Sequence, residues 1–497
     1  MKLYELLKGV RTLGGEENLN AEVLTIFSDS RKKVEKGVFV AINGQKRNGN
    51  DHINQALSNG ATIIITDNKE VFDKCKDSVL VENSRKALSY MWNNFYKDPT
   101  KNIKIIAVTG TNGKTSCAYY MYSILKAIGA KRGLISTIEC LINEEKIETN
   151  GGSDVVDLYS AMTTPDPEIL YSVFNEMRTR GVEYIVMEAS SHALQLDKLF
   201  PINVDYAIFT NLSAEHLDFH KDFESYYQAK KRLFENAGVS IIAIDDVFGE
   251  RLKNEIKGSS FSCSIRKKAD FCAEKIELLK GGYQYEIRNE NLRLSILGKI
   301  NGEFSVSNSL LCVACASLLG IEPEKIFSGI FSLTCIPGRF ERVDGSNVYI
   351  DYAHTPYAME KILESSRKIN PNGRVIALFG CGGDRDREKR AKMGSICTQN
   401  ADVCIITADN SRSERTLDII SDILKGVDDG FDVAVFTNRE KAIIYAISQM
   451  RENDVLMLLG KGHERYEIDK NGKHFFDERE IVRRELKNVK NKSLYSL

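Results

Sequence analysis

The stretch "GTNGKT" (residues 110–115) lies between an apolar run and a helical pattern. The two glycines let backbone amides approach phosphate oxygens closely, and the positive N-terminal end of a helix favours a bound anion. Lys114 can neutralise the terminal phosphates of a nucleotide, and the Thr115 hydroxyl can bind Mg²⁺. The common phosphate-binding loop reads G-x-x-x-x-G-K-[ST], and its first glycine would fall at Val108. The stretch therefore predicts a nucleotide phosphate site of a shorter type.

A carboxylate also stands at the end of a strand-like run. Glu188 ends "YIVME" and should lie at the carboxyl end of a strand beside the glycine loop, where it can bind Mg²⁺. The neighbouring Ser190 and His192 could suggest a hydrolase. The G-x-S-x-G elbow is absent, however, and serine next to histidine in sequence does not make a catalytic pair.

The stretch "TNLSAEHLDFH" (residues 210–220) gathers carboxylates and histidines before a helical pattern that carries Lys230 and Lys231. A zinc site would need a third soft ligand at a typical spacing, which the stretch does not offer. A magnesium or phosphate-transfer role fits the oxygen-rich company better. Five of the seven histidines lie in motif-like stretches of this kind, namely His192, His216, His220, His354 and His463.

The elements that must position these residues alternate between short apolar runs and amphipathic stretches, which is typical of α/β proteins. Residues 1–99 carry three strand-like runs and end in a polar linker, "WNNFYKDPTKN". Residues 100–335 alternate strand, loop and helix, which indicates a parallel sheet. Residues 336–497 carry five strand-like runs separated by helical patterns, which predicts a doubly wound sheet. We therefore predict three domains with these bounds.

In such open sheets, ligands bind beyond the carboxyl ends of the strands. Four motif-like stretches of the third segment fall at those ends: "DYAHTP", "GCGGDRD", "TADNSR" and "GKGHE".

Composition limits the classes of partner. A chain of 497 residues with a formal net charge of −1 has no overall attraction to nucleic acid or to anionic membranes. No run of about 18 apolar residues and no signal peptide is seen. The 11 cysteines lack framework spacing, which predicts reduced thiols and a cytoplasmic location. Cys312 and Cys315 lie in an apolar helical run, so we expect them to be buried rather than redox-active or metal-binding.

Ten stretches, in order and across nearly the whole chain, resemble the Mur ligase family and most closely its UDP-N-acetylmuramoyl-tripeptide synthetase (MurE) type. They are "SDSRKKVEKGVFVAINGQ", "VTGTNGKTS", "TTPDP", "MEASSHAL", "TNLSAEHLDFH", "PGRFE", "DYAHTP", "GCGGDRDREKR", "DNSR" and "GKGHE". The resemblance implies an N-terminal domain for a uridine nucleotide substrate, a central ATPase-type domain and a C-terminal Rossmann-like domain. It also explains the loop, because this family uses G-T-x-G-K-[TS].

The resemblance further implies the chemistry. ATP phosphorylates the free carboxylate of UDP-N-acetylmuramoyl-L-Ala-D-Glu, and the amine of a diamino acid then attacks the acyl phosphate to give an amide, ADP and phosphate. The implied cofactors are ATP, two Mg²⁺ ions and a CO₂-derived carbamate on Lys230. The implied partners are small molecules only, without nucleic acid or membrane, and the chain is expected to be a monomer.

Residue by residue, the resemblance assigns catalysis to Lys114, Glu188, His216 and Lys230. Metal ligands would be Thr115, Glu188, His216 and carbamylated Lys230. ATP would contact Gly110, Thr111, Asn112, Gly113, Lys114, Thr115, Ser116, Asn308, Arg339, Asp351 and His354. The uridine nucleotide substrate would contact Ser30, Thr163, Thr164, Ser190 and Lys198, although the family usually has arginine where Lys198 stands.

The amino acid is implied by "DNSR" (residues 409–412), in which Ser411 replaces the proline of the family's D-N-P-R. The arginine of that motif pairs with the second carboxylate of meso-diaminopimelate, which lysine lacks. The full implied set is Arg385, Asp409, Asn410, Arg412, Gly460 and Glu464. We expect meso-diaminopimelate as substrate, and L-lysine, another amine or a related enzyme acting on a different carboxylate are the alternatives.

Two other classes compete with an amide ligase. A phosphotransferase would explain the glycine loop but not "HLDFH", "DYAHTP" or "GKGHE". A regulatory nucleotide-binding module would be expected to have lost Lys114, Thr115 or Glu188, all of which are present.

Overall fold

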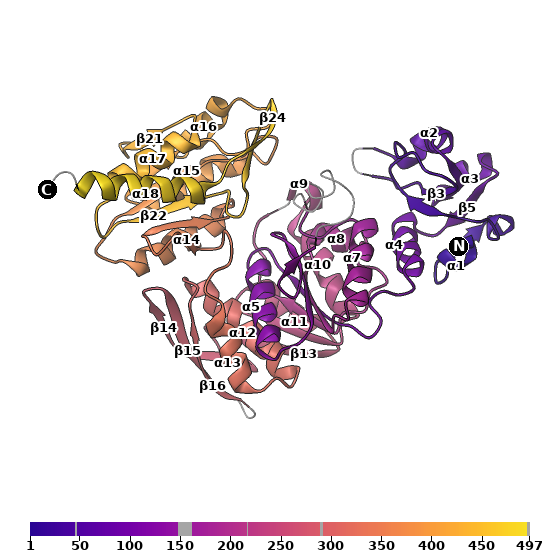
Figure 1. The fold of residues 1–497 in the computed structure, drawn as a ribbon, viewed down its shortest axis with the longest axis horizontal. Coiled ribbons are helices and arrows are strands. Elements are labelled where there is room, and N and C mark those ends of the chain that lie inside the picture. The colour runs from indigo at the N-terminus through magenta and orange to yellow at the C-terminus, as the bar shows by residue number, and fades with distance from the viewer. Residues whose placement is uncertain (45–46, 148–161, 216, 289–291, 495–497) are drawn as a thin grey trace. The chain divides into compact units, whose positions relative to one another are not determined.

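The computed structural model describes residues 1–44, 47–147, 162–215, 217–288 and 292–494. These residues divide into two compact units. The first unit contains residues 1–109, 129–208 and 227–240, and the second contains residues 110–128, 209–226 and 241–497. Figure 1 labels the elements, which fold as helices and mostly parallel sheets.

The first unit begins with a five-stranded sheet in the order β1-β5-β4-β3-β2, parallel except for the edge strand β1. The three strand-like runs predicted here form β3, β4 and β5. The predicted linker is helical as far as Phe95, because Trp92 packs into the interior at 6% exposure. The elements are α1 Leu3–Leu6, β1 Thr12–Gly14, β2 Thr25–Phe27, β3 Gly37–Val40, α2 Ile53–Ser58, β4 Ala61–Thr66, α3 Lys69–Lys74, β5 Ser78–Val81 and α4 Ser84–Phe95.

A second set of strands in the first unit has the order β11-β6-β10-β7-β8-β9. Its central strands β6, β10 and β7 are parallel, as predicted for a phosphate-binding sheet. β8 and β9 are antiparallel additions at the edge. The elements here are β6 Lys104–Thr109, β7 Arg132–Ile135, β8 Cys140–Ile142, β9 Glu145–Lys146, α7 Pro167–Thr179, β10 Tyr184–Glu188, α8 Ser191–Gln195 and β11 Tyr206–Phe209.

The second unit contains the helix that follows the glycine loop, α5 Lys114–Ala127. Nearly all of its side chains are buried, which is expected of a helix that is apolar on every face. The helices α12 Glu303–Leu318 and α13 Pro323–Ser332 pack against it. Cys312 and Cys315 lie fully buried in α12, as predicted from their apolar surroundings.

The strands β13 to β16 of the second unit were not predicted. They lie in the order β13-β14-β15-β16, and β14 to β16 are antiparallel. The bounds here and around them are α9 Leu217–His220, α10 Phe223–Glu235, β12 Val239–Ala243, α11 Val247–Glu255, β13 Ser259–Ser264, β14 Phe271–Leu279, β15 Gly282–Arg288 and β16 Arg293–Gly298.

The C-terminal part of the second unit is the predicted doubly wound sheet, in the order β17-β18-β22-β19-β20-β21. All neighbours are parallel except β17 and β18. It is drawn in orange to yellow in Figure 1, and its elements are β17 Glu341–Arg342, β18 Val348–Asp351, α14 Pro356–Ile369, β19 Val375–Phe379, α15 Glu388–Asn400, β20 Val403–Ile406, α16 Thr416–Leu424, β21 Val433–Val435, α17 Arg439–Gln449, β22 Val455–Leu459, β23 Tyr466–Asp469, β24 Gly472–Phe475 and α18 Glu478–Leu494.

Alternation along β19 explains why this sheet is covered on both faces. Val375, Ala377 and Phe379 point into a core shared with α14, α15 and α16. Ile376 and Leu378 point into a second core shared with α17 and α18. Successive strand residues face opposite sides, so a strand that is apolar throughout must be buried on both. Among the described residues, no helix has the length and apolar character that crossing a membrane requires.

Candidate functional site

The glycine loop joins the end of β6 to the start of α5. Gly113 caps the helix in the left-handed region at φ 86°. A Cβ atom at Gly110 would lie 1.8 Å from Thr210 Oγ1, and one at Gly113 would lie 2.4 Å from Asn308 Oδ1. Glycine is therefore required at both positions by neighbouring side chains as well as by backbone conformation.

Lys114 lies back over this loop. Its Nζ donates hydrogen bonds to Gly110 O at 2.9 Å and to Thr111 O at 2.8 Å. The ammonium group is thus held at the mouth of the loop, where the first turn of α5 directs its backbone amides. A concave set of amides next to a positioned cation fits the phosphates of a nucleotide.

Two residues that the sequence reasoning did not single out shape the wall of the loop. Asn211 accepts a hydrogen bond from Thr111 N at 2.8 Å through its carbonyl and one from Asn112 N at 3.0 Å through Oδ1. Thr210 Oγ1 donates to Asn112 O at 2.6 Å. Both follow β11, so their place at the end of a strand was the available signal.

The predicted nucleotide residues of the C-terminal part lie close to the start of α5. Arg339 Nη2 donates to Thr115 Oγ1 at 3.2 Å, and the guanidinium lies 4.7 Å from the centre of the Tyr352 ring. Thr115 is 3% exposed, and Ser116 and Asn308 are also buried. The structure therefore brings Lys114, Thr115, Asn308 and Arg339 together within the second unit.

Asp351 and His354 both make hydrogen bonds to nearby backbone groups. Both Asp351 carboxylate oxygens accept amide hydrogen bonds at 2.7 Å, from Phe340 N and Ala353 N, and burial raises the pKa of this carboxyl group. His354 contacts Tyr352 O through Nδ1 at 2.7 Å and Glu215 Oε1 through Nε2 at 3.1 Å. The "DYAHTP" stretch thereby reaches the residue that precedes His216, which itself lies outside the described residues.

Glu188 ends β10 and is paired with Val108 of β6, close to the start of the glycine loop. It is fully buried, and its two oxygens accept hydrogen bonds from Thr137 N at 2.8 Å and Thr137 Oγ1 at 3.0 Å. Thr137, which follows β7, was not predicted. A buried carboxylate held in this way is a hard oxygen donor of the kind that Mg²⁺ prefers.

The residues predicted to contact the uridine nucleotide substrate largely converge on the same strand end. Thr164 Oγ1 donates to Glu188 O at 2.9 Å and accepts from Ser190 N at 3.0 Å. Ser190 caps α8 by accepting from Ala193 N, which is a structural use of the serine that was weighed as a nucleophile. Lys198 pairs with Asp166 at 2.8 Å.

Thr163 and Ser30 complete that predicted set. Thr163 Oγ1 lies within hydrogen-bonding distance of Thr137 Oγ1, at 3.1 Å, which places it beside the partner of Glu188. Ser30 is buried in the N-terminal part of the same unit and donates to Gln55 Oε1 at 2.7 Å.

Lys230 lies in α10 and is 1% exposed. Lysine is rarely buried without a specific role, so Lys230 is not an ordinary solvated helix lysine. Glu188 and Lys230 belong to the first unit, and Thr115 belongs to the second. Within the described part of the chain, no group of three or more His, Cys, Asp and Glu side chains is placed to hold a metal ion.

The predicted amino-acid set gathers at the carboxyl ends of β20 and β22. Asn410 Nδ2 donates to Glu464 Oε2 at 2.8 Å, and its Oδ1 accepts from Lys461 Nζ at 3.2 Å. A Cβ atom at Gly460 would lie 2.9 Å from Asp409 Oδ2. Arg412 Nη1 donates to Asn410 O at 3.3 Å, so five of the six residues are connected, whereas Arg385 is exposed.

Lys461 balances the charge of this group and was not singled out from the sequence, although "GKGHE" contains it. It is fully buried and lies 3.6 Å from Asp409. Burial opposes the charged form of Asp409, but Lys461 and Arg439 outweigh burial and hold the pKa of Asp409 below its usual value. Burial and the nearby Asp409 raise the pKa of Glu464. The group thus offers one carboxylate whose charged form is favoured by its cationic neighbours, Asp409, and one whose neutral form is favoured by burial, Glu464.

Comparison with known proteins agrees with this arrangement. Residues 108–316 match the Mur ligase middle domain, and residues 338–462 match the Mur ligase, glutamate ligase domain. The chain is 40% identical over 485 residues to a UDP-N-acetylmuramoyl-L-alanyl-D-glutamate–2,6-diaminopimelate ligase of Clostridium acetobutylicum, with 96% of each chain covered. It is 39% identical over 491 residues to the ligase of the same name in Clostridium tetani, covering 97% of this chain and 99% of that one.

A solved structure of a ligase with that name has a TM-score of 0.67 and 25% identity, covering 96% of this chain and 99% of the other. The two family matches take in most of the chain, and the relatives cover nearly all of it. This chain belongs to the Mur ligase family.

Proposed function

We propose that this chain is the ATP-dependent ligase that joins meso-diaminopimelate to the D-glutamate carboxylate of UDP-N-acetylmuramoyl-L-Ala-D-Glu in peptidoglycan precursor synthesis. The observation that carries the proposal is the 40% identity, across 96% of both chains, with a ligase named for that reaction. Two features support it: the hydrogen-bonded group around Asn410, and the glycine loop with Lys114 held against it.

An amine cannot displace oxide from a carboxylate directly, so the carboxylate must first be phosphorylated. The chain's contribution is then charge neutralisation and positioning. Lys114 would face the terminal phosphates, and the amides of residues 110–116 would hold the others. Asn308, Arg339, Asp351 and His354 would complete the nucleotide contacts. Thr163, Thr164, Ser190, Lys198 and Ser30 would hold the muramoyl dipeptide.

Two Mg²⁺ ions, when bound, would offset the negative charge that develops on the transferring phosphoryl group. We propose Thr115, Glu188, His216 and carbamylated Lys230 as their ligands. The buried carboxylate of Glu188 and the near-complete burial of Lys230 support this set. Carbamylation would replace an ammonium group, which is costly to bury, with an oxygen ligand.

Arg412 and Arg385 are proposed to recognise the second carboxylate of the diamino acid, and Asp409, Asn410, Gly460 and Glu464 to recognise its amino end. A guanidinium can hold a carboxylate with two parallel hydrogen bonds, and that interaction is lost with lysine. This difference is the physical basis for choosing diaminopimelate.

We further propose domain bounds of 1–99, 100–335 and 336–497, a monomeric state and a cytoplasmic location. The two family matches fall inside the second and third proposed domains, which supports those bounds. ATP and uridine nucleotides as co-substrates support the location.

The test of the function is ADP and phosphate release with UDP-N-acetylmuramoyl-L-Ala-D-Glu and a panel of meso-diaminopimelate, L-lysine and L-ornithine. We expect turnover that depends on both the dipeptide and diaminopimelate. Turnover with lysine alone would overturn the amino-acid assignment. Absence of turnover with every amine would point to a related enzyme that acts on a different carboxylate.

The carbamate is tested separately by ¹³C NMR of the protein in ¹³C-bicarbonate. We expect a carbamate resonance that is absent from Lys230→Ala and retained in Lys231→Ala, the adjacent lysine on the same helix. A resonance that survives Lys230→Ala would place the modification on another residue, and a wild-type spectrum without the resonance would overturn the carbamate.

A further inference from the structure

Hydrogen bonds connect the two loops that carry Arg385 and Arg412 of the amino-acid set. The first loop (residues 380–387) follows β19, and the second loop (residues 407–415) follows β20. Gly383 N donates to Asn410 O at 2.9 Å, and Arg412 Nη1 donates back to Gly383 O at 2.8 Å. Ser413 donates to Asp384 through both its amide and its hydroxyl. The two loops are thus hydrogen-bonded to each other at several positions.

Each loop holds one residue in a costly backbone conformation. Asp384 and Arg412 both have φ of 53°, in the left-handed region that side-chain-bearing residues seldom adopt. Such a conformation persists only where the surrounding contacts determine it fully. Arg412 is held in this conformation by the contacts between the two loops and by the hydrogen bond from its amide to Ile468 O in β23, at 3.0 Å.

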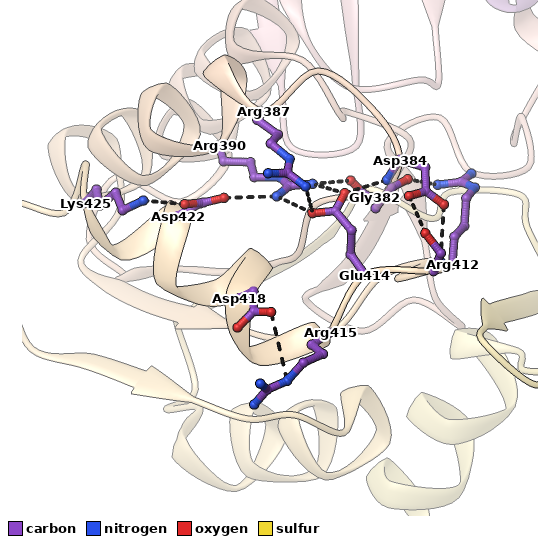
Figure 2. Close-up of polar contacts among 12 residues, drawn as sticks. Gly382, Asp384, Arg387, Arg390, Arg412, Glu414, Arg415, Asp418, Asp422 and Lys425 are labelled. Carbon is purple, nitrogen blue, oxygen red and sulfur yellow. Dashed lines mark hydrogen bonds and ion pairs between the residues drawn. The ribbon is translucent and has the colours of Figure 1, made fainter.

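Glu414 and Arg390 make further contacts with both loops, and Figure 2 shows them. Glu414 Oε1 accepts from Asp384 N at 2.6 Å. Arg390, on α15 and fully buried, donates to both Glu414 oxygens at 2.8 and 3.0 Å. It also donates to Gly382 O at 3.3 Å and to Asp422 on α16 at 3.0 Å. One rigid guanidinium therefore fixes the first loop, the second loop and α16 relative to one another.

We propose that Glu414 and Arg390 are positioning residues that set the Arg412 guanidinium for the second carboxylate of the diamino acid. The inference rests on the proposed function, in which Arg412 receives that carboxylate. In the described chain, the side-chain hydrogen bonds of Arg412 are both made by Nη1, which leaves Nε and Nη2 for a ligand. Glu414 and Arg390 contact the two loops, and through them the backbone that carries Arg412.

The test is Glu414→Gln. Glutamine keeps an acceptor for Asp384 N but turns an amide group toward Arg390, so the two-pronged contact is broken. Arg390 keeps Asp422 as a partner, so the variant should fold. We expect kcat/KM for meso-diaminopimelate to fall by about 10-fold, mainly through KM, while any turnover of L-lysine is unchanged.

The double variant Glu414→Gln with Arg412→Ala separates positioning from a general structural role. If Glu414 acts through Arg412, adding Glu414→Gln to Arg412→Ala should change kcat/KM less than about 2-fold. An equal loss in both backgrounds, or an equal loss with every amine, would overturn the inference. Asp418→Asn is the matched control, because the exposed Asp418 pairs only loosely with Arg415, at 3.9 Å.

Failure of the inference can be told apart from failure of the proposed function. If Arg412→Ala selectively impairs diaminopimelate and Glu414→Gln does not, the positioning role is overturned and the proposed function stands. If Arg412→Ala impairs all amines equally, the assignment of Arg412 falls and takes the positioning role with it. Near-native hydrogen exchange of α15 and α16 peptides in Glu414→Gln would show that the fold is kept.

Discussion

Two fully buried arginines, on helices that cover the C-terminal sheet, contact the loops at its strand ends in different ways. Arg439 on α17 donates to Glu478 at 2.8 Å, to Ala408 O at 3.1 Å and to Leu459 O at 2.8 Å, and its carboxylate partner is 1% exposed. Arg390 on α15 instead pairs with Glu414 and Asp422, which are 12% and 26% exposed.

The difference lies in where the partner carboxylates are. Around Arg439 both charges are sealed from water, so neither can be solvated if the other is removed. Around Arg390 the carboxylates reach solvent and continue to Arg387 and Lys425. The sealed pair connects the ends of β20 and β22, whereas the network that reaches solvent connects the loops that follow β19 and β20.

The largest expected effect comes from Glu478→Gln. Removing the charge strands a buried guanidinium, and we expect a loss of about 3–5 kcal/mol in unfolding free energy. Fluorescence of Trp92, the only tryptophan, would report on α4 of the first unit and not on this sheet. Hydrogen exchange of α17 and α18 peptides is therefore the suitable measurement. The double variant Arg439→Met with Glu478→Leu should recover much of that stability. A loss below about 1 kcal/mol in the single variant would mean that the pair is not sealed.

Glu414→Gln should destabilise the same sheet by only about 1 kcal/mol, because Arg390 keeps Asp422 and water can reach the vacated side. Hydrogen exchange of α15 peptides measures this. A loss as large as that of Glu478→Gln would erase the distinction between the two arginines.

Lowering the pH should weaken the contacts that the Glu414 carboxylate makes with Arg390. Hydrogen bonding from Arg390 lowers the pKa of Glu414 from 4.5 to about 2. A carboxyl group with a lowered folded-state pKa stabilises the fold above its unfolded pKa, and that contribution is lost as pH falls from about 4.5 to about 2. The stability difference between the wild-type chain and Glu414→Gln should therefore shrink across this window. A difference that stays constant would mean that the charge of Glu414 contributes nothing.

Asp418→Asn should have the smallest effect, within about 0.5 kcal/mol, because Asp418 and Arg415 are 62% and 76% exposed. Chemical denaturation followed by far-ultraviolet circular dichroism is sufficient here. A larger loss would show that exposed pairs on α16 also take part in the network.

Much of the fold was predictable because the parallel strands are short apolar runs that end in motif-like stretches. β19, β20 and β22 were recognisable in this way from "GRVIALFGCGG", "ADVCIITADN" and "DVLMLLGKG". The antiparallel strands β14 to β16 were missed, since one face is exposed and its charged residues dilute the apolar signal. The available clue was the alternation of apolar and polar residues, in which the apolar residues Tyr283, Tyr285 and Ile287 are the buried ones.

For the site, chain order brought the expected residues to strand ends but could not supply their partners. Thr137 lies 51 residues from Glu188, and Arg390 lies 24 residues from Glu414. Such contacts depend on which strands become neighbours, and single-sequence spacing does not encode that order. His216 stays a prediction, because it lies outside the described residues.

The backbone conformation of Arg412 affects which substitutions this position can accept. At φ 53° any residue with a side chain carries a conformational cost of about 1–2 kcal/mol that glycine does not. A change from arginine to glycine, which a single nucleotide can make, would thus relax the backbone while it removes the guanidinium. The same change would also remove the hydrogen bonds from Nη1 to Gly383 O and Asn410 O, so the gain in backbone conformation is offset by lost contacts between the two loops.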